Sequence, residues 1–164
     1  MERLKRLEDI CQPDQRWLNR VDIDYSTGAV TPTTVESIYT LVEEIELGAN
    51  IPNEVRSHFE IARNLIVYSW FVYSFSVVAA MQALASLEMA VRIKTNATKR
   101  DNFYNLLDRV FPGRELVSNL APPVPLSKVV TKLRNDLAHG SSTMHGQGVN
   151  TLGFCAELIN ELYP

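Results

Sequence analysis

Apolar residues recur every three or four positions along most of the chain, the spacing that places them on one face of a helix. Segments 35–45, 55–66, 103–110, 126–137 and 152–162 carry this pattern. Sustained alternation, which would indicate strands, is not found. The pattern predicts an all-α fold, an antiparallel bundle of four to five main helices within a single domain spanning 1–164.

The first 31 residues follow the pattern only briefly. Leu4, Leu7 and Cys11 have helical spacing and predict a short amphipathic helix packed on the bundle. Residues 12–31 contain a proline, a glycine and several aspartates without a sustained period, which predicts a long loop with an extended piece at 21–25. Loops of this length are usually functional or mobile.

Local signals predict where several elements begin and end. Thr33-Thr34-Val35-Glu36 is a capping-box pattern, with threonine as the cap and Glu36 reaching back, and Gly48 is a stop signal. The proline-rich segment 121–125 is expected to be a stiff connector before the helix that Pro125 or Ser127 opens.

A run of 23 residues without a charge extends from Leu65 to Leu87. Its length would suffice to cross a bilayer, but it contains several serines and a glutamine, and its flanks lack the basic asymmetry of a lone span. We therefore expect no membrane partner, and a helix buried in a core or a subunit interface. No glycine or proline occurs between Asn53 and Phe111, and a break near 63–68 is expected.

Composition narrows the class of protein. The chain has 164 residues, 46% hydrophobic and 21% charged, which is typical of a globular domain. Cys11 and Cys155 lack the spacing of a metal site and are expected to be buried thiols in a reducing, cytoplasmic setting, and the charged N-terminus does not resemble a signal peptide. Charge is uneven: residues 90–140 carry nine basic and four acidic side chains, whereas the net charge is −3.

The positive segment contains Arg134-Asn135-Asp136-Leu137-Ala138-His139-Gly140 at a predicted helix end. This Arg-x4-His pattern resembles the signature of the HEPN superfamily, α-helical domains that include many metal-independent ribonucleases. Upstream, Ala83 to Arg92 looks like the Leu-Glu-x-x-x-Arg helix that precedes the motif in many bacterial members. The resemblance covers roughly residues 60–162.

The resemblance implies endoribonuclease activity by 2′-hydroxyl attack on the phosphodiester. Histidine titrates near neutrality and can move protons, and arginine binds two phosphate oxygens at once. The resemblance therefore implies that Arg134 stabilises the phosphate, that His139 transfers protons and that Asn135 orients the substrate. Asp136 and Glu88 would support these residues. No metal or cofactor is expected, and the basic residues expected to bind RNA are Lys128, Lys132, Lys99 and Arg100.

Structural interpretations of the same residues stay open. A histidine before a glycine at a helix end also stabilises the negative pole of the helix dipole. Arg134 could pair with Glu88, and Glu88 with Arg92 is most simply an ion pair at i, i+4. Many HEPN domains are non-catalytic, so the alternative function is a nucleotide- or RNA-binding or protein-interaction module.

Geometry adds a constraint. Arg134 and His139 are five positions apart, which places them about 140° apart around an ideal helix. Either the helix breaks before His139, or two chains each bring a motif helix to a shared cleft, as in the dimers that the resemblance implies. We expect the homodimer, with Ala80 at an interface position of the uncharged run, and a further partner or antitoxin protein is a possible addition.

Overall fold

The computed structural model describes residues 4–118, 121–139 and 148–164. Within them the fold is mainly α-helical, with two small antiparallel hairpins that correct the all-α expectation. In chain order the elements are the short 3₁₀ helix η1 (Leu7–Asp9), β1 (Val21–Ile23), β2 (Val30–Pro32), α1 (Val35–Glu43), α2 (Asn53–Tyr68), α3 (Phe75–Thr95), α4 (Phe103–Val110), β3 (Glu115–Ser118), β4 (Ala121–Pro125), α5 (Leu126–Ala138) and α6 (Gly148–Leu162).

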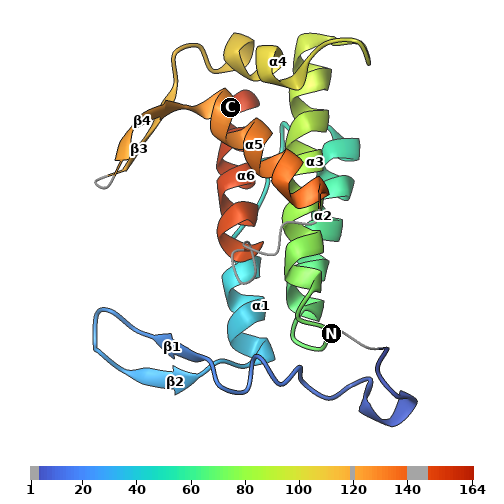
Figure 1. The fold of residues 1–164 in the computed structure, drawn as a ribbon, viewed down its shortest axis with the longest axis vertical. Helices are drawn as coiled ribbons and strands as arrows, with labels where there is room; N and C mark the ends of the chain where they lie inside the picture. The colour runs from blue at the N-terminus through green and yellow to red at the C-terminus, as the bar shows by residue number, and fades with distance from the viewer. Residues whose placement is uncertain (1–3, 119–120, 140–147) are drawn as a thin grey trace.

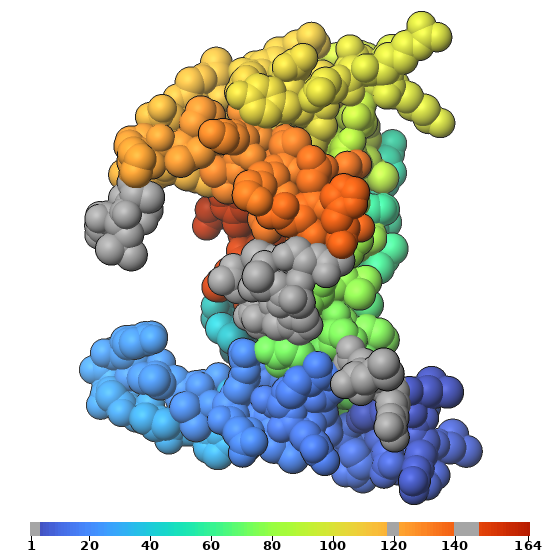
Figure 2. All heavy atoms as spheres, viewed as in Figure 1, coloured from blue at the N-terminus to red at the C-terminus, as the bar shows by residue number. Residues whose placement is uncertain are grey.

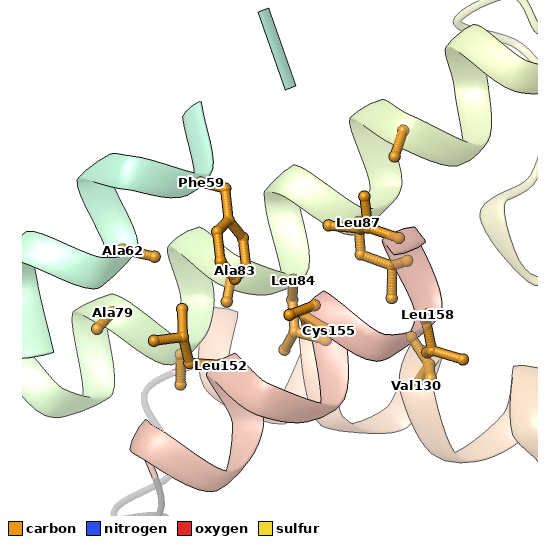
Figure 3. Close-up of a cluster of buried hydrophobic side chains, with 14 of the residues drawn as sticks. Phe59, Ala62, Ala79, Ala83, Leu84, Leu87, Val130, Leu152, Cys155 and Leu158 are labelled. Atoms are coloured by element: carbon orange, nitrogen blue, oxygen red, sulfur yellow. The ribbon is translucent and has the colours of Figure 1, made fainter. Parts of the chain in front are cut away.

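Helix α3 is the centre of the fold and packs chiefly on α2 and α6. Figure 1 shows α2 running opposite to α3, whereas α6 runs in the same direction as α3, so the bundle is only partly antiparallel. Small residues let the helices approach closely, and larger apolar side chains fill the space between them. Figure 3 shows this core, which includes Phe59, Ala62, Ala79, Ala83, Leu84, Leu87, Val130, Leu152, Cys155 and Leu158.

The core confirms the apolar stripes predicted for α2 and α6. Burial raises the pKa of the Cys155 thiol, as expected for an inert core cysteine. Gly148 begins α6 where a Cβ would lie 2.5 Å from the backbone oxygen of Ser76 and 2.6 Å from the Ile66 side chain. Only glycine permits this close approach of α6 to α2 and α3.

The uncharged run 65–87 is divided between two helices, and the break lies at 69–74 rather than at the expected 63–68. The indole of Trp17 donates to the Ser69 carbonyl at 2.6 Å, and the Asp14 carboxylate accepts from the Tyr73 backbone amide at 3.2 Å. These contacts from the N-terminal segment hold the turn. The break is therefore set by residues more than fifty positions away.

Among the helices that the structure describes, α3 alone is long and apolar enough to satisfy the length and composition of a membrane span. Half of its most apolar window is buried inside the fold, which is how a core helix behaves. Ala80, expected at a dimer interface, is only 2% exposed and packs within the core. That expectation was wrong, because Ala80 lies on the part of α3 that packs against its own chain.

The N-terminal segment differs from the predicted amphipathic helix. Leu4, Leu7 and Cys11 are all exposed, and only one 3₁₀ turn forms there, so the predictions of a packed helix and of a buried Cys11 were wrong. Trp17 instead anchors the segment, with its ring 5.2 Å from that of Tyr73. The rest of the expected loop contains β1 and the start of β2, and β1 covers residues 21–23 of the extended piece expected at 21–25.

Helix α1 is capped by Thr34 and Ser37, not by Thr33 and Glu36, and ends at Glu43 rather than at Gly48. The Thr33 hydroxyl is unavailable because it donates to the Asp22 carboxylate at 2.9 Å. The proline-rich segment, expected to be a connector, is strand β4 and pairs with β3. Figure 2 shows the two hairpins projecting from the same side of the molecule.

Candidate functional site

Helix α5 carries the Arg-x4-His motif and begins directly after Pro125. Leu126, Val130 and Leu137 bury one face. The opposite face is an exposed stripe of residues at intervals of three and four. We call it the α5 polar stripe, and it consists of Lys128, Lys132, Asn135 and His139.

Arg134 lies beside this stripe, on the side of α5 that meets α3. Its guanidinium Nη2 is 3.4 Å from Glu88 Oε2, and its Nη1 donates to Asn135 Oδ1 at 3.3 Å. The Arg134 side chain is 49% exposed, so one of its faces is open to solvent while Glu88 fixes the other. An arginine held in this way can still bind a phosphate, because its guanidinium group has five N–H donors.

Glu88 lies between two arginines, and its side chain is 17% exposed. Its Oε1 accepts from Arg92 Nη2 at 2.8 Å and from Nε at 3.0 Å. Both structural interpretations of this carboxylate made from the sequence, the i, i+4 pair with Arg92 and the pair with Arg134, are present. Glu88 therefore tethers the motif helix to α3.

Arg92 extends this network to the turn between α3 and α4. It donates to the carbonyls of Thr98 and Asp101, at 2.9 and 3.2 Å. The same turn carries Lys99 and Arg100, both exposed. The Asp101 carboxylate accepts hydrogen bonds from the Thr98 backbone amide and hydroxyl, and these bonds lower the pKa of Asp101. The charged carboxylate therefore stabilises the turn. The basic turn is thus connected to Arg134 through Glu88 and Arg92.

Asp136 pairs with Lys132 rather than with a residue of the motif. The distance from Lys132 Nζ to Asp136 Oδ2 is 2.6 Å, and the two side chains are 71% and 43% exposed, respectively. Such an i, i+4 pair contributes about 0.3–0.5 kcal/mol to helix stability. It orders the Lys132 ammonium on the polar stripe and partly neutralises it.

His139 is the C-terminal cap of α5, and its backbone amide donates to the Asn135 carbonyl at 3.0 Å. The helix continues unbroken through Ala138, so it does not break before His139, which was one of the two geometries considered. Arg134 and His139 therefore stay about 140° apart around the axis and about 7.5 Å apart along it. One copy of α5 does not direct both side chains at one phosphate. Gly140 and His145 lie outside the described residues.

A polar cluster that sequence reasoning missed lies between α2 and α3. His58 Nδ1 is 2.9 Å from Ser86 Oγ, and the Ser86 hydroxyl donates to the Gln82 carbonyl at 2.9 Å. The Gln82 amide nitrogen also donates to the His58 carbonyl at 3.1 Å. Ser86 is fully buried, so this arrangement is not a nucleophile with its base. It satisfies polar groups where α2 crosses α3, and the polar residues within the apolar run were its only sequence signal.

No group of three His, Cys, Asp or Glu side chains in the described ranges lies close enough together to hold a metal ion.

Comparisons with protein-family models, with curated proteins and with solved structures returned no match for this chain.

Proposed function

We propose that this chain is a metal-independent endoribonuclease resembling the HEPN enzymes, and that its site is completed by two copies of α5. The observation that carries the proposal is the presentation of Arg134, which Glu88 fixes on one side and which stays half exposed on the other. The exposed imidazole of His139 at the end of the same helix supplies a group that can accept and donate a proton.

In this proposal Arg134 binds the scissile phosphate and stabilises the charge that builds up on its oxygens. His139 accepts the proton of the 2′-hydroxyl as the 2′-O–P bond forms, and then returns it to the 5′-oxygen as the P–5′-O bond breaks, which balances the reaction without water or metal. Asn135, next to Arg134 and on the polar stripe, hydrogen-bonds the substrate. Lys128 and Lys132 bind flanking phosphates, and Lys99 and Arg100 extend the basic surface.

The separation of the two motif side chains on an unbroken helix supports a homodimer in this proposal. In an isologous pair, each polar stripe faces its two-fold mate, so that Arg134 of one copy can approach the partner's His139. The stripe is exposed and free of large apolar residues, so the cleft between two such helices would be polar and positively charged. We also propose a cytoplasmic location, where such an enzyme meets its RNA.

The test is incubation of the purified protein with a mixed RNA substrate in EDTA. The expected products carry 2′,3′-cyclic phosphate and 5′-hydroxyl ends. Arg134→Ala and His139→Ala should each lower the rate by about 10²–10⁴-fold. Arg6→Ala, which removes one exposed arginine from the N-terminal segment, is the matched control and should cleave at the wild-type rate. Cleavage that survives both motif substitutions would refute the assignment.

A second candidate, a non-catalytic RNA-binding module, is favoured by the ion pair that already occupies Arg134. Under this alternative, RNA binds the polar stripe without being cut. Reversal of Lys128 and Lys132 to glutamate should then weaken binding to all sequences about equally and lower the salt slope by roughly 0.7 for each phosphate of a single strand that the variant no longer binds. Binding with this salt dependence but no cleavage in the EDTA assay would select the module over the enzyme.

A further inference from the structure

A groove away from the polar stripe lies where α1 meets the first half of α6. Its volume is about 490 Å³, and its lining is mainly apolar. Figure 2 shows the molecule hollowed between its two hairpins, with parts of α6 and α1 at the inner edge of the hollow. The groove is lined by Leu41, Glu44, Ile45, Val149, Asn150, Gly153, Phe154 and Glu157.

The shape of the groove favours an elongated ligand, such as a helix, over a compact small molecule. It is open along its length rather than enclosed, whereas small-molecule sites bury most of their ligand. Leu41 is 49% exposed, although its neighbours Ile38 and Val42 on α1 are almost fully buried. Gly153 deepens the groove, because the nearest atom to a Cβ built there is Ile45 Cδ1 at 3.8 Å. A groove between two helices with apolar anchor points is the geometry that accepts an amphipathic helix.

The walls of the groove are fixed before any occupant arrives. The Arg63 guanidinium donates to the Val42 and Glu43 carbonyls, which satisfies the C-terminal end of α1. Asn160 of α6 accepts from the Gly48 amide at 2.8 Å and donates to the Glu46 carbonyl at 3.0 Å. These bonds join α2 to the end of α1, and α6 to the segment that follows α1. A rigid site loses little entropy on binding, which favours recognition.

Charge identifies the occupant. Glu44 and Glu157 are exposed at the groove, whose lining contains no basic side chain. Neither carboxylate has an ion-pair partner among the described residues, in contrast to Glu60, Glu88 and Glu161, which pair with arginines. Two unpaired carboxylates beside an apolar floor complement a segment with basic residues on either side of apolar anchors.

We propose that this groove docks a short amphipathic helix of a partner protein, with leucine-like side chains on the floor and lysine or arginine against Glu44 and Glu157. The acidic groove is unsuited to RNA, so the docking surface is separate from the polar stripe of α5. A partner held there leaves the motif helix free. The inference does not depend on ribonuclease activity.

The test uses three fluorescein-labelled synthetic helical peptides of about fifteen residues, measured by fluorescence anisotropy with the full chain. The first has leucines at helical spacing flanked by lysines, the second replaces the lysines by glutamates, and the third replaces the leucines by serines. We expect only the first to bind with micromolar affinity, and its affinity should fall as salt rises. Equal binding of the second peptide, or no binding of the first, overturns the proposal.

Variants locate the binding. Gly153→Phe fills the groove and should weaken the first peptide at least about tenfold, whereas Gly153→Ala, whose Cβ makes only an ordinary contact, should stay within about twofold. Glu44→Lys with Glu157→Lys should weaken it by about tenfold, equivalent to about 1.4 kcal/mol. Glu8→Lys with Asp108→Lys changes the net charge equally at exposed sites outside the groove and is the matched control.

Light scattering on the same variants distinguishes a second copy from a partner. We expect Gly153→Phe to keep the wild-type oligomeric state. If it instead abolishes self-association, the occupant is a second copy of this chain and the partner proposal is wrong. Peptide binding that is unchanged in Gly153→Phe would likewise place the peptide elsewhere and overturn the proposal.

Discussion

Glu88→Ala tests the network that holds Arg134 in place. The carboxylate receives two hydrogen bonds from Arg92, whose side chain is 27% exposed, and one longer contact from Arg134, which is 49% exposed. Exposed pairs at i, i+4 contribute about 0.3–0.5 kcal/mol, and the partly buried, two-bond geometry with Arg92 should raise this to about 1 kcal/mol. The contact with Arg134, at 3.4 Å, should contribute less than about 0.5 kcal/mol.

Urea unfolding of the single and double alanine variants at Glu88, Arg92 and Arg134 gives the two coupling energies. Arg92 still donates to two turn carbonyls when Glu88 is absent, so the total cost of Glu88→Ala should stay near 1–2 kcal/mol, a fall in Tm of about 2–8 °C. A coupling of Glu88 to Arg134 as large as that to Arg92 would refute this ranking. Arg134 would then be a structural residue and not a residue available to bind phosphate.

Three further predictions concern the fold. Trp17→Ala removes a buried indole and its bond to the Ser69 carbonyl, and should lower the free energy of unfolding by about 3–5 kcal/mol in urea melts. Hydrogen bonds, chiefly from the Arg16 side chain, hold the pKa of Asp14 well below its usual range. The ionised Asp14 carboxylate therefore stabilises the fold above about pH 4, and this stabilisation is lost as the pH falls further. Between pH 6 and pH 3, Asp14→Asn should lose less stability than the wild type. Gly148→Ala places a methyl group against a backbone oxygen of α3 and should cost at least about 2 kcal/mol by thermal unfolding, whereas Gly153→Ala should not destabilise.

The sequence predicted those helices whose buried residues have helical spacing within the segment itself. In α2 the residues Val55, Phe59, Ala62 and Ile66 have helical spacing and all four are buried, so periodicity alone was sufficient. The same holds for α6. The motif helix was also predicted close to its bounds, because prolines mark its start and a glycine follows its end.

Other features depend on contacts between distant segments, which no local pattern records. The turn after α2 forms where Trp17 and Asp14 bind its backbone, and Thr33 could not cap α1 because Asp22 takes its hydroxyl. The hairpin β1–β2 was missed as a sheet because each strand has only three residues, too few for a sustained alternation, and because the apolar side chains of Val21, Ile23 and Val30 are exposed.

The candidate site shows the same division. Helical spacing was enough to anticipate that Glu88 pairs with Arg92, and the pair with Arg134 was an alternative that the sequence left open. The acidic groove between α1 and α6 could not be anticipated. Its walls come from segments more than a hundred residues apart, joined by Asn160 and the Gly48 amide.

The most direct test of the proposed enzyme is to mix Arg134→Ala with His139→Ala after checking that each variant folds and dimerises. If Arg134 of one chain acts with the partner's His139, a mixed dimer contains one intact site and one site lacking both groups. Random exchange of subunits should then restore RNA cleavage in EDTA to about a quarter of the wild-type rate, although each variant alone is inactive. No cleavage by the mixture, or a wild-type chain that is monomeric at micromolar concentration, would contradict the shared site and with it the proposed ribonuclease.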